Sequence, residues 1–358
     1  MEIKFGTSGW RDIIADGFTF QNVRICTQAI ADYIKSTGHK GGVVIGSDTR
    51  FLSRQFMIIA ARVMAGNGIK AFLCKRDTPT PVISFEILRR KGSGGINFTA
   101  SHNPPEYQGL KFSPDWGGPA LPATTGDIEK RANALMKTGS FKDMELVEAQ
   151  KQGLIEDIDP METYLADLTK KINLDAIRAA KLKILVNPMY GTSRGYLDRI
   201  LREAGCNVTV MNDHLDPYFG GLPPEPSEHE IPDMIEKMKA GTFDLGLGTY
   251  GDADRFGILG PKGEFYQPNQ ILAMLLDHLK STRTWSGGVA RSVATTQFID
   301  AVAKFHGIEV FETPVGFKFI GDLISKDKII LGGEESAGLT MKGHVPEKDG
   351  ILACLLVA

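Results

Sequence analysis

The residues best suited to chemistry stand in a polar stretch at 99–105, which reads Thr-Ala-Ser-His-Asn-Pro-Pro. It follows Gly94–Phe98, an apolar run that predicts a short strand. Ser101 and His102 are adjacent, and the prolines after them restrict the backbone. The pattern suits an exposed, rigid loop that carries a nucleophile. The alternative is an ordinary serine turn before a proline-rich loop.

A second polar stretch, 251–255, alternates two aspartates with small residues and ends in an arginine. It follows the predicted strand 243–248, and in an extended loop Asp252 and Asp254 would point to the same side. Two carboxylates suit Mg²⁺, which completes its coordination with water and phosphate oxygens. Arg255 could offer a planar fork to a phosphate. The alternative is a solvated acidic turn, and the stretch is too short for an EF-hand.

Two glycine-rich stretches could bind a sugar phosphate. Residues 332–338 place paired glutamates and a serine between glycines, which suits sugar hydroxyls, although a charged hairpin loop is equally consistent. Residues 6–11 could cradle a phosphate through backbone N–H groups and Arg11. This second stretch lacks the lysine of a Walker loop and the spacing of a Rossmann loop.

Residues 191–195 fit the G-x-S-x-G pattern of a hydrolase nucleophile elbow, between a predicted strand and a predicted helix. A downstream acid and His344 keep the hydrolase order. No HGGG-type stretch for an oxyanion hole accompanies them, which argues against a hydrolase.

These stretches must be positioned by three segments, each of which has the pattern of a strand, a helix and a second strand. Breaks in the pattern predict three α/β domains at 1–152, 153–256 and 257–358. The predicted elements are strands 43–46, 71–74, 183–186, 208–210, 243–248, 288–293, 308–310 and 328–331 and helices 53–67, 194–204 and 296–305. The last ten residues, 349–358, read as an apolar helix without a stop signal, so we expect a truncated chain.

The composition is that of an ordinary globular protein: 358 residues, 42% hydrophobic, 23% charged, net charge −2. It provides no basis for a nucleic-acid or membrane partner, and no apolar run reaches membrane-spanning length. The N-terminus shows no signal-peptide pattern. The cysteines are far apart without a CxxC pair, which favours reduced thiols in a cytoplasmic protein over disulfides or a zinc site: Cys26, Cys74, Cys206 and Cys354.

Taken together and in this order, the motifs resemble those of the α-D-phosphohexomutase family, over the whole chain. TASHNPPEYQGLKF resembles the phosphoserine loop of that family, and four further stretches resemble its other active-site loops: GTSGWR at 6–11, GDADR at 251–255, ETPVGFK at 312–318 and GEESAG at 333–338. GEESAG together with GHVPEKDG at 343–350 is more like phosphoglucomutases than dual-specificity phosphomannomutase/phosphoglucomutases.

The resemblance implies interconversion of glucose 1-phosphate and glucose 6-phosphate through a phosphoserine and a bisphosphate intermediate. It also implies α/β domains with mixed sheets, an active site in the cleft between them, Mg²⁺, and glucose 1,6-bisphosphate as activator. A phosphomannomutase or phosphoglucosamine mutase, or a catalytically impaired phosphosugar-binding relative, are the alternatives. The partner would be a hexose phosphate, and both a monomer and a homodimer remain open.

The resemblance also implies roles for individual residues. The metal would lie on Asp252, Asp254 and the phosphate of Ser101. Lys318 and His344 are two candidates for the general acid/base. The catalytic set would be Ser101, His102, Lys111, Arg11, Lys318 and His344, and the substrate-binding set Arg255, Arg291, Thr313, Gly316, Glu334 and Ser336.

Two features depart from the family pattern. Tyr250 stands where the family usually has a third aspartate, and a neutral phenol is a poor ligand for a hard cation. We therefore expect weakened Mg²⁺ binding, unless a nearby carboxylate substitutes. The resemblance also implies a fourth, C-terminal domain that grips the other phosphate, and we expect this chain to lack it. Both departures favour the binding relative, whereas Ser101 and Lys111 favour an enzyme.

Overall fold

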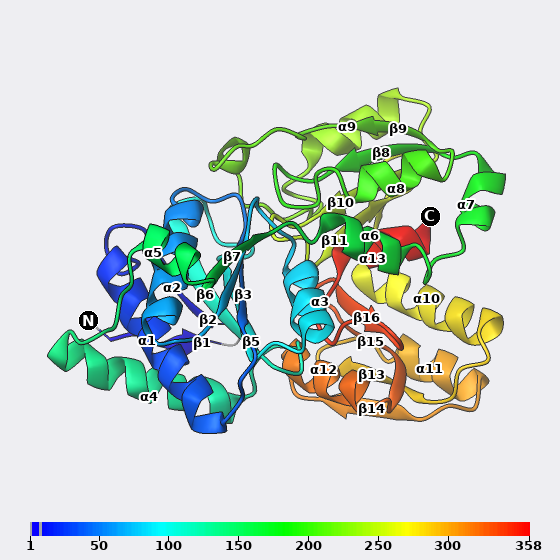
Figure 1. Ribbon diagram of the computed structural model, residues 1–358. Helices are drawn as coiled ribbons and strands as arrows, with labels where there is room; N and C mark the ends of the chain where they lie inside the picture. The colour runs from blue at the N-terminus through cyan, green and yellow to red at the C-terminus, as the bar shows by residue number, and fades with distance from the viewer. Residues whose placement is uncertain (1, 7–8) are drawn as a thin grey trace. The chain divides into compact units, whose positions relative to one another are not determined.

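The computed structural model describes residues 2–6 and 9–358, which fall into two compact units, Met1–Pro160 and Met161–Ala358 (Figure 1). Among the described residues, the first unit contains one mixed sheet of seven strands in the order β1-β2-β6-β5-β3-β4-β7. Its strands are β1 (Phe5–Gly6), β2 (Gly9–Ile13), β3 (Val43–Ser47), β4 (Ala71–Cys74), β5 (Gly94–Phe98), β6 (Tyr107–Pro114) and β7 (Ile155–Ile158). Its helices are α1 (Phe20–Thr37), α2 (Ser53–Gly66), α3 (Thr80–Arg90), α4 (Pro122–Thr138) and α5 (Leu146–Lys151).

The centre of this sheet is parallel and one side of it is antiparallel. Strands β5, β3, β4 and β7 run parallel, while β6 pairs antiparallel with both β5 and β2. Every residue of β3 and β5 is buried, as expected for strands at the centre of a sheet. Because parallel strands end at the same edge, the loops after β3 and β5 lie together.

The second unit contains two more mixed sheets among the described residues, ordered β12-β11-β10-β8-β9 and β14-β13-β15-β16. The first has strands β8 (Lys183–Asn187), β9 (Asn207–Val210), β10 (Leu245–Thr249), β11 (Phe256–Leu259) and β12 (Phe265–Tyr266), with helices α6 (Met161–Leu168), α7 (Leu174–Ala180), α8 (Leu197–Glu203), α9 (Pro232–Ala240) and the short η1 (Phe219–Gly221). The second has strands β13 (Gly288–Ser292), β14 (Val310–Thr313), β15 (Ile329–Glu334) and β16 (Gly338–Met341), with helices α10 (Pro268–Thr282), α11 (Phe298–Phe305), α12 (Phe317–Ser325) and α13 (Gly350–Val357).

Helix α13, red in Figure 1, joins the two sheets of this unit. It contacts β10 and β11 of one sheet and β16 of the other. Asp349 caps it by accepting a hydrogen bond from the Leu352 N–H at 2.9 Å. The Gly350 N–H donates to the Ala253 carbonyl and the Asp349 N–H to the Leu339 carbonyl, so the start of α13 is bonded to the β10–β11 connection of one sheet and to β16 of the other.

The prediction of three α/β units with mixed sheets is confirmed. The predicted domain boundaries after 152 and 256 stay predictions; β7 lies beyond the first, and β11 begins at the second. Helix α8 begins three residues later than predicted because Gly195 has a positive φ of 78°. Strand β14 begins two residues later than predicted, at Val310.

No helix formed by the described residues combines the length and the apolarity needed to cross a bilayer.

Candidate active site

Ser101 lies in the loop between β5 and β6, with a backbone φ of 55°. This left-handed region is unfavourable for residues other than glycine. The Ser101 N–H donates to Thr99 Oγ1 at 2.9 Å, and its side-chain Oγ has no hydrogen-bond partner among the described residues. The prediction of an exposed loop holds only in part: residues 102–105 are half-buried and Glu106 is exposed, but Ser101 itself is 1% exposed. Loop carbonyls bond inward to the buried Arg50.

Two cationic residues lie beside this loop on the same sheet face. Arg11 on β2 is opposite Gly109 on β6, and Lys111 follows two residues later, so both side chains belong to one face. Arg11 also donates to Asn103 Oδ1 of the serine loop at 2.7 Å. A side chain at Gly109 would lie 2.3 Å from the Thr99 carbonyl, so the loop packs directly on this strand. Of the 6–11 stretch, residues 7 and 8 lie outside the described residues.

The aspartate stretch forms the tight connection between the antiparallel strands β10 and β11. Here the expectation of an extended loop was wrong, because Ala253 has a φ of 57° and its N–H bonds back to the Tyr250 carbonyl at 2.8 Å. The result is a turn that keeps both carboxylates inside: Asp252 is 0% exposed and Asp254 is 1% exposed. The solvated acidic turn is therefore not what the chain forms.

Neighbouring backbone holds this turn in place. The Gly251 N–H donates to the Pro224 carbonyl at 3.0 Å, and the Gly251 carbonyl accepts from the Thr192 N–H at 2.9 Å. From the other side, the Gly350 N–H at the start of α13 donates to the Ala253 carbonyl at 2.9 Å. The turn thus has no freedom to relax independently of its surroundings.

Tyr250 is buried beside this turn, with the Arg255 guanidinium 5.2 Å from its ring centre. Burial raises the pKa of the Tyr250 phenol, the charge of Glu225 adds to that rise, and Arg255 opposes it. The phenol is therefore neutral at physiological pH. It cannot replace the charge of a carboxylate at this position.

A buried lysine supplies the positive charge next to the aspartates. Lys348 Nζ lies 3.1 Å from Asp254 Oδ2 and 2.9 Å from Glu347 Oε1. Burial alone would lower the pKa of Lys348, but these two carboxylates outweigh it and raise the pKa above its ordinary value. Lys348 was not among the predicted site residues, although the polar run 347–349 before an apolar helix marked the region.

The predicted sugar-binding stretches meet around Glu334, at the end of β15. Glu334 Oε1 accepts a hydrogen bond from the Gly316 N–H at 2.7 Å, which brings the 312–318 and 333–338 stretches together. Burial raises the pKa of Glu334, while nearby Lys348 limits the rise. Ser336 lies in the turn between β15 and β16, so this stretch is indeed a hairpin. Lys318 lies in the first turn of α12, half-buried.

Thr313, at the end of β14, donates to the Arg291 carbonyl at 3.4 Å. The Arg291 side chain itself is engaged elsewhere. It forms a bidentate pair with Asp300 at 2.6 and 2.7 Å and a further ion pair with Glu312 at 2.9 Å. With its donors committed to protein carboxylates, Arg291 is better explained as a structural residue than as a substrate ligand.

His344 is also engaged, at both ring nitrogens. Nε2 lies 2.7 Å from Asp349 Oδ2, which also accepts from the Tyr164 hydroxyl, and Nδ1 lies 3.2 Å from Lys171 Nζ. The side chain is 0% exposed. A general acid/base needs a nitrogen within reach of substrate, so this geometry favours a structural role for His344. His102 is half-buried next to Ser101.

The 191–195 stretch supports the aspartate turn rather than forming a nucleophile elbow. The Ser193 hydroxyl is buried and shares a 2.7 Å hydrogen bond with Thr249 Oγ1. A side chain at Gly191 would lie 2.4 Å from the Gly251 carbonyl. His344, the hydrolase candidate base, is bonded to Asp349 instead.

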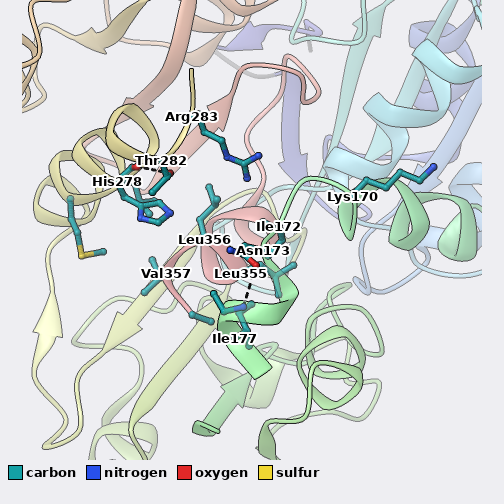
Figure 2. Close-up of a pocket in the computed structure, with 14 residues that line it drawn as sticks. Lys170, Ile172, Asn173, Ile177, His278, Thr282, Arg283, Leu355, Leu356 and Val357 are labelled. Atoms are coloured by element: carbon teal, nitrogen blue, oxygen red, sulfur yellow. Dashed lines mark hydrogen bonds between the residues drawn. The ribbon is translucent and has the colours of Figure 1, made fainter. Parts of the chain in front are cut away.

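Figure 2 shows a separate pocket of the second unit, between α7, α10 and α13. Leu355, Leu356 and Ile177 form its apolar part, and His278 and Arg283 its basic part. It contains none of the predicted site residues. We therefore assign it no part in the chemistry.

The side chains of the aspartate turn fit a hard cation only if phosphate and water complete its coordination. Within residues 2–6 and 9–358, no three His, Cys, Asp or Glu side chains gather as a metal-binding group. Asp252 and Asp254 provide two buried carboxyl groups. Mg²⁺ commonly takes one or two carboxylates and fills its other positions with phosphate oxygens and water. The residues present fit such an ion, provided that phosphate and water complete its shell.

Sequence and structure comparisons give consistent matches. Profiles described as phosphoglucomutase/phosphomannomutase alpha/beta/alpha domains I, II and III match residues 2–138, 162–263 and 267–358. The phosphoglucomutase of Komagataeibacter xylinus is 36% identical over 99% of this chain and 69% of its own length, and human phosphoglucomutase-1 is 32% identical over 98% and 68%. The solved structure of a candidate phosphomannomutase from Thermus thermophilus is 33% identical, with a TM-score of 0.91 over 100% of this chain and 79% of that one.

Proposed function

Since the chain belongs to the phosphoglucomutase/phosphomannomutase family of phosphohexomutases, we propose that it interconverts glucose 1-phosphate and glucose 6-phosphate through a phosphoserine at Ser101. The observation that carries the proposal is the state of Ser101: a strained, buried backbone presents a hydroxyl that no described residue engages. Strain of this kind persists at functional sites, where the surroundings hold it.

In this proposal phosphorylated Ser101 gives its phosphoryl group to the free hydroxyl of the sugar phosphate: a bond from phosphorus to the sugar oxygen forms as the bond to Ser101 Oγ breaks, and the general acid/base takes the hydroxyl proton. The bound bisphosphate then returns its other phosphoryl group to Ser101 Oγ, and the sugar oxygen that loses phosphorus takes up the proton. Arg11, Lys111 and Arg255 would each stabilise the charge of the phosphoryl group. His102 adjoins the nucleophile as a further member of the catalytic set.

Mg²⁺ bound to Asp252 and Asp254, with a phosphate oxygen of Ser101, would neutralise charge on the transferring group. Glu334 and Ser336 would hold sugar hydroxyls, with Thr313 and Gly316 orienting the ring. We place the general acid/base at Lys318, since both nitrogens of His344 are occupied. The choice of glucose depends on the GEESAG stretch and on the names of relatives at 32–36% identity. Mannose and glucosamine phosphates are the competing substrates.

Intact mass spectrometry of the chain, before and after incubation with glucose 1,6-bisphosphate and Mg²⁺, tests the proposal. We expect a gain of one phosphate that maps to Ser101, no gain in Ser101→Ala, and an unchanged gain in the control Ser140→Ala, which alters an exposed serine. A panel of glucose, mannose and glucosamine phosphates then identifies the substrate. A chain whose Ser101 never takes phosphate would be a phosphosugar-binding relative, and preference for another sugar would correct the substrate.

Tyr250→Asp is expected to raise the Mg²⁺ affinity by about tenfold, because a third carboxylate joins the two buried aspartates. Isothermal titration with Mg²⁺ measures the change without reference to activity. Tyr250→Phe is the matched control: it removes the hydroxyl without adding charge and should leave the affinity unchanged. Equal affinities of the unsubstituted chain and Tyr250→Asp would show that Tyr250 does not weaken the site.

A further inference from the structure

Arg50 is a buried arginine whose side chain bonds chiefly to the Ser101 loop, with a further bond to Asp48. It follows β3, is 2% exposed, and directs all three of its guanidinium nitrogens at protein acceptors. Nε donates to Asp48 Oδ2 at 3.1 Å. Four more hydrogen bonds reach carbonyls of one loop, those of Ser101 at 2.8 Å, Asn103 at 2.5 Å, Pro104 at 2.7 Å and Tyr107 at 2.9 Å.

The bonds to these four carbonyls indicate the structural role of Arg50. The carbonyls of Ser101, Asn103 and Pro104 lie between β5 and β6, outside the strand pairing, and that of Tyr107 lies at the first residue of β6. Buried carbonyls without partners are costly, so a loop that turns inward needs a donor from outside it. A guanidinium provides several donors from one rigid plane, and Asp48 orients that plane through a second bond, from the Arg50 N–H at 3.0 Å.

We propose that Arg50 is a positioning residue for phosphoryl transfer, which holds Ser101 in its left-handed conformation so that Oγ keeps one direction. The proposal rests on the proposed function of Ser101 as the phosphoryl carrier. Arg50 touches the carbonyl of Ser101 and not its hydroxyl, so it acts through the backbone. Asp48 forms an ion pair with Arg50, so the two side chains together carry no net charge. Arg50 therefore acts by fixing the geometry of the loop and not by exerting an electrostatic field on the phosphate.

Lysine cannot replace this arrangement, because an ammonium has three donors and no planar fork. Arg50→Lys must therefore release some of the loop carbonyls or the bond to Asp48. The loop would then sample several conformations, of which only some direct Oγ correctly. A displacement of this kind affects the rate of transfer more than the binding of the sugar phosphate.

The test compares the rate of Ser101 phosphorylation by glucose 1,6-bisphosphate in the full chain, in Arg50→Lys and in Arg62→Lys. Arg62 is the matched control, since it also makes several ion pairs in the first unit, with Asp143 and Glu145. We expect Arg50→Lys to slow phosphorylation by about 100-fold. The sugar-phosphate KM should change little, and hydrogen exchange should rise in 101–107 but not in α2. The control should match the unsubstituted chain in all three measurements.

An Arg50→Lys variant that phosphorylates at the normal rate overturns the inference. If that variant does not fold, Arg50→Ala is titrated with guanidinium below its denaturing range. If guanidinium restores both the fold and the phosphorylation rate of Arg50→Ala, the inference is supported. If it restores the fold alone, or neither, the inference is contradicted. Failure of the unsubstituted chain to take phosphate overturns the proposed function, and this inference with it. That outcome is distinct from a defect confined to Arg50 variants.

Discussion

Asp254→Ala is expected to lower the free energy of unfolding by about 3 kcal/mol, even without metal or substrate, because it removes a partner of a buried ammonium. Lys348 Nζ is 3.1 Å from Asp254 Oδ2, and the two side chains are 6% and 1% exposed. Glu347 remains as a second partner of Lys348, which limits the loss. Denaturant unfolding in the presence of a chelator measures the effect on the protein alone.

A double-mutant cycle with Lys348→Met shows whether the pair itself is responsible. If the two charges stabilise each other, the double variant loses less stability than the sum of the single variants, by about 1–3 kcal/mol. The control is Asp175→Ala, which breaks the exposed pair with Arg178 and should change stability by no more than about 0.5 kcal/mol. Additive losses at Asp254 and Lys348 would mean that they contribute independently.

Gly350→Ala is expected to be the most damaging single-methyl change in the second unit. The new Cβ would lie 2.2 Å from the Arg255 carbonyl oxygen and 3.1 Å from that of Ala253. Both are backbone atoms, which cannot rotate away, so either α13 or the aspartate turn must shift. We expect a loss of about 1–3 kcal/mol in unfolding free energy. Mg²⁺ affinity should fall in parallel, since the turn carries both carboxylates proposed to bind the metal.

Unfolding curves and Mg²⁺ titrations of this variant give the two readings independently. Gly126→Ala is the control, because Gly126 lies in α4 with open space around its Cβ position, and alanine there should stabilise the helix by up to about 1 kcal/mol. Unchanged Mg²⁺ affinity in a destabilised Gly350→Ala would show that α13 moves and the turn does not. The coupling proposed between helix start and turn would then be absent.

The proposed location of the chemistry follows from the sequence alone, because its main groups are contiguous. Ser101 and the aspartate pair each stand directly after an apolar run, and the ends of strands are where α/β folds place functional loops. Strand and helix positions follow from hydrophobic periodicity for the same local reason, with an error at Gly195, where a positive φ delays the next helix.

The partners of these groups depend on distances that only folding sets. Arg50 bonds to a carbonyl 51 residues away, and Lys348 reaches Asp254 across an even longer separation, so no local pattern indicates either contact. His344 and Arg291 have residue types that suit catalysis, and only the fold shows that carboxylates of Asp349 and Asp300 already engage them. Electrostatic pairing and burial depend on separation in space, while periodicity depends on separation along the chain. The sequence could therefore indicate which loops carry the chemistry, but only the folded protein determines which charges in them remain available to a substrate.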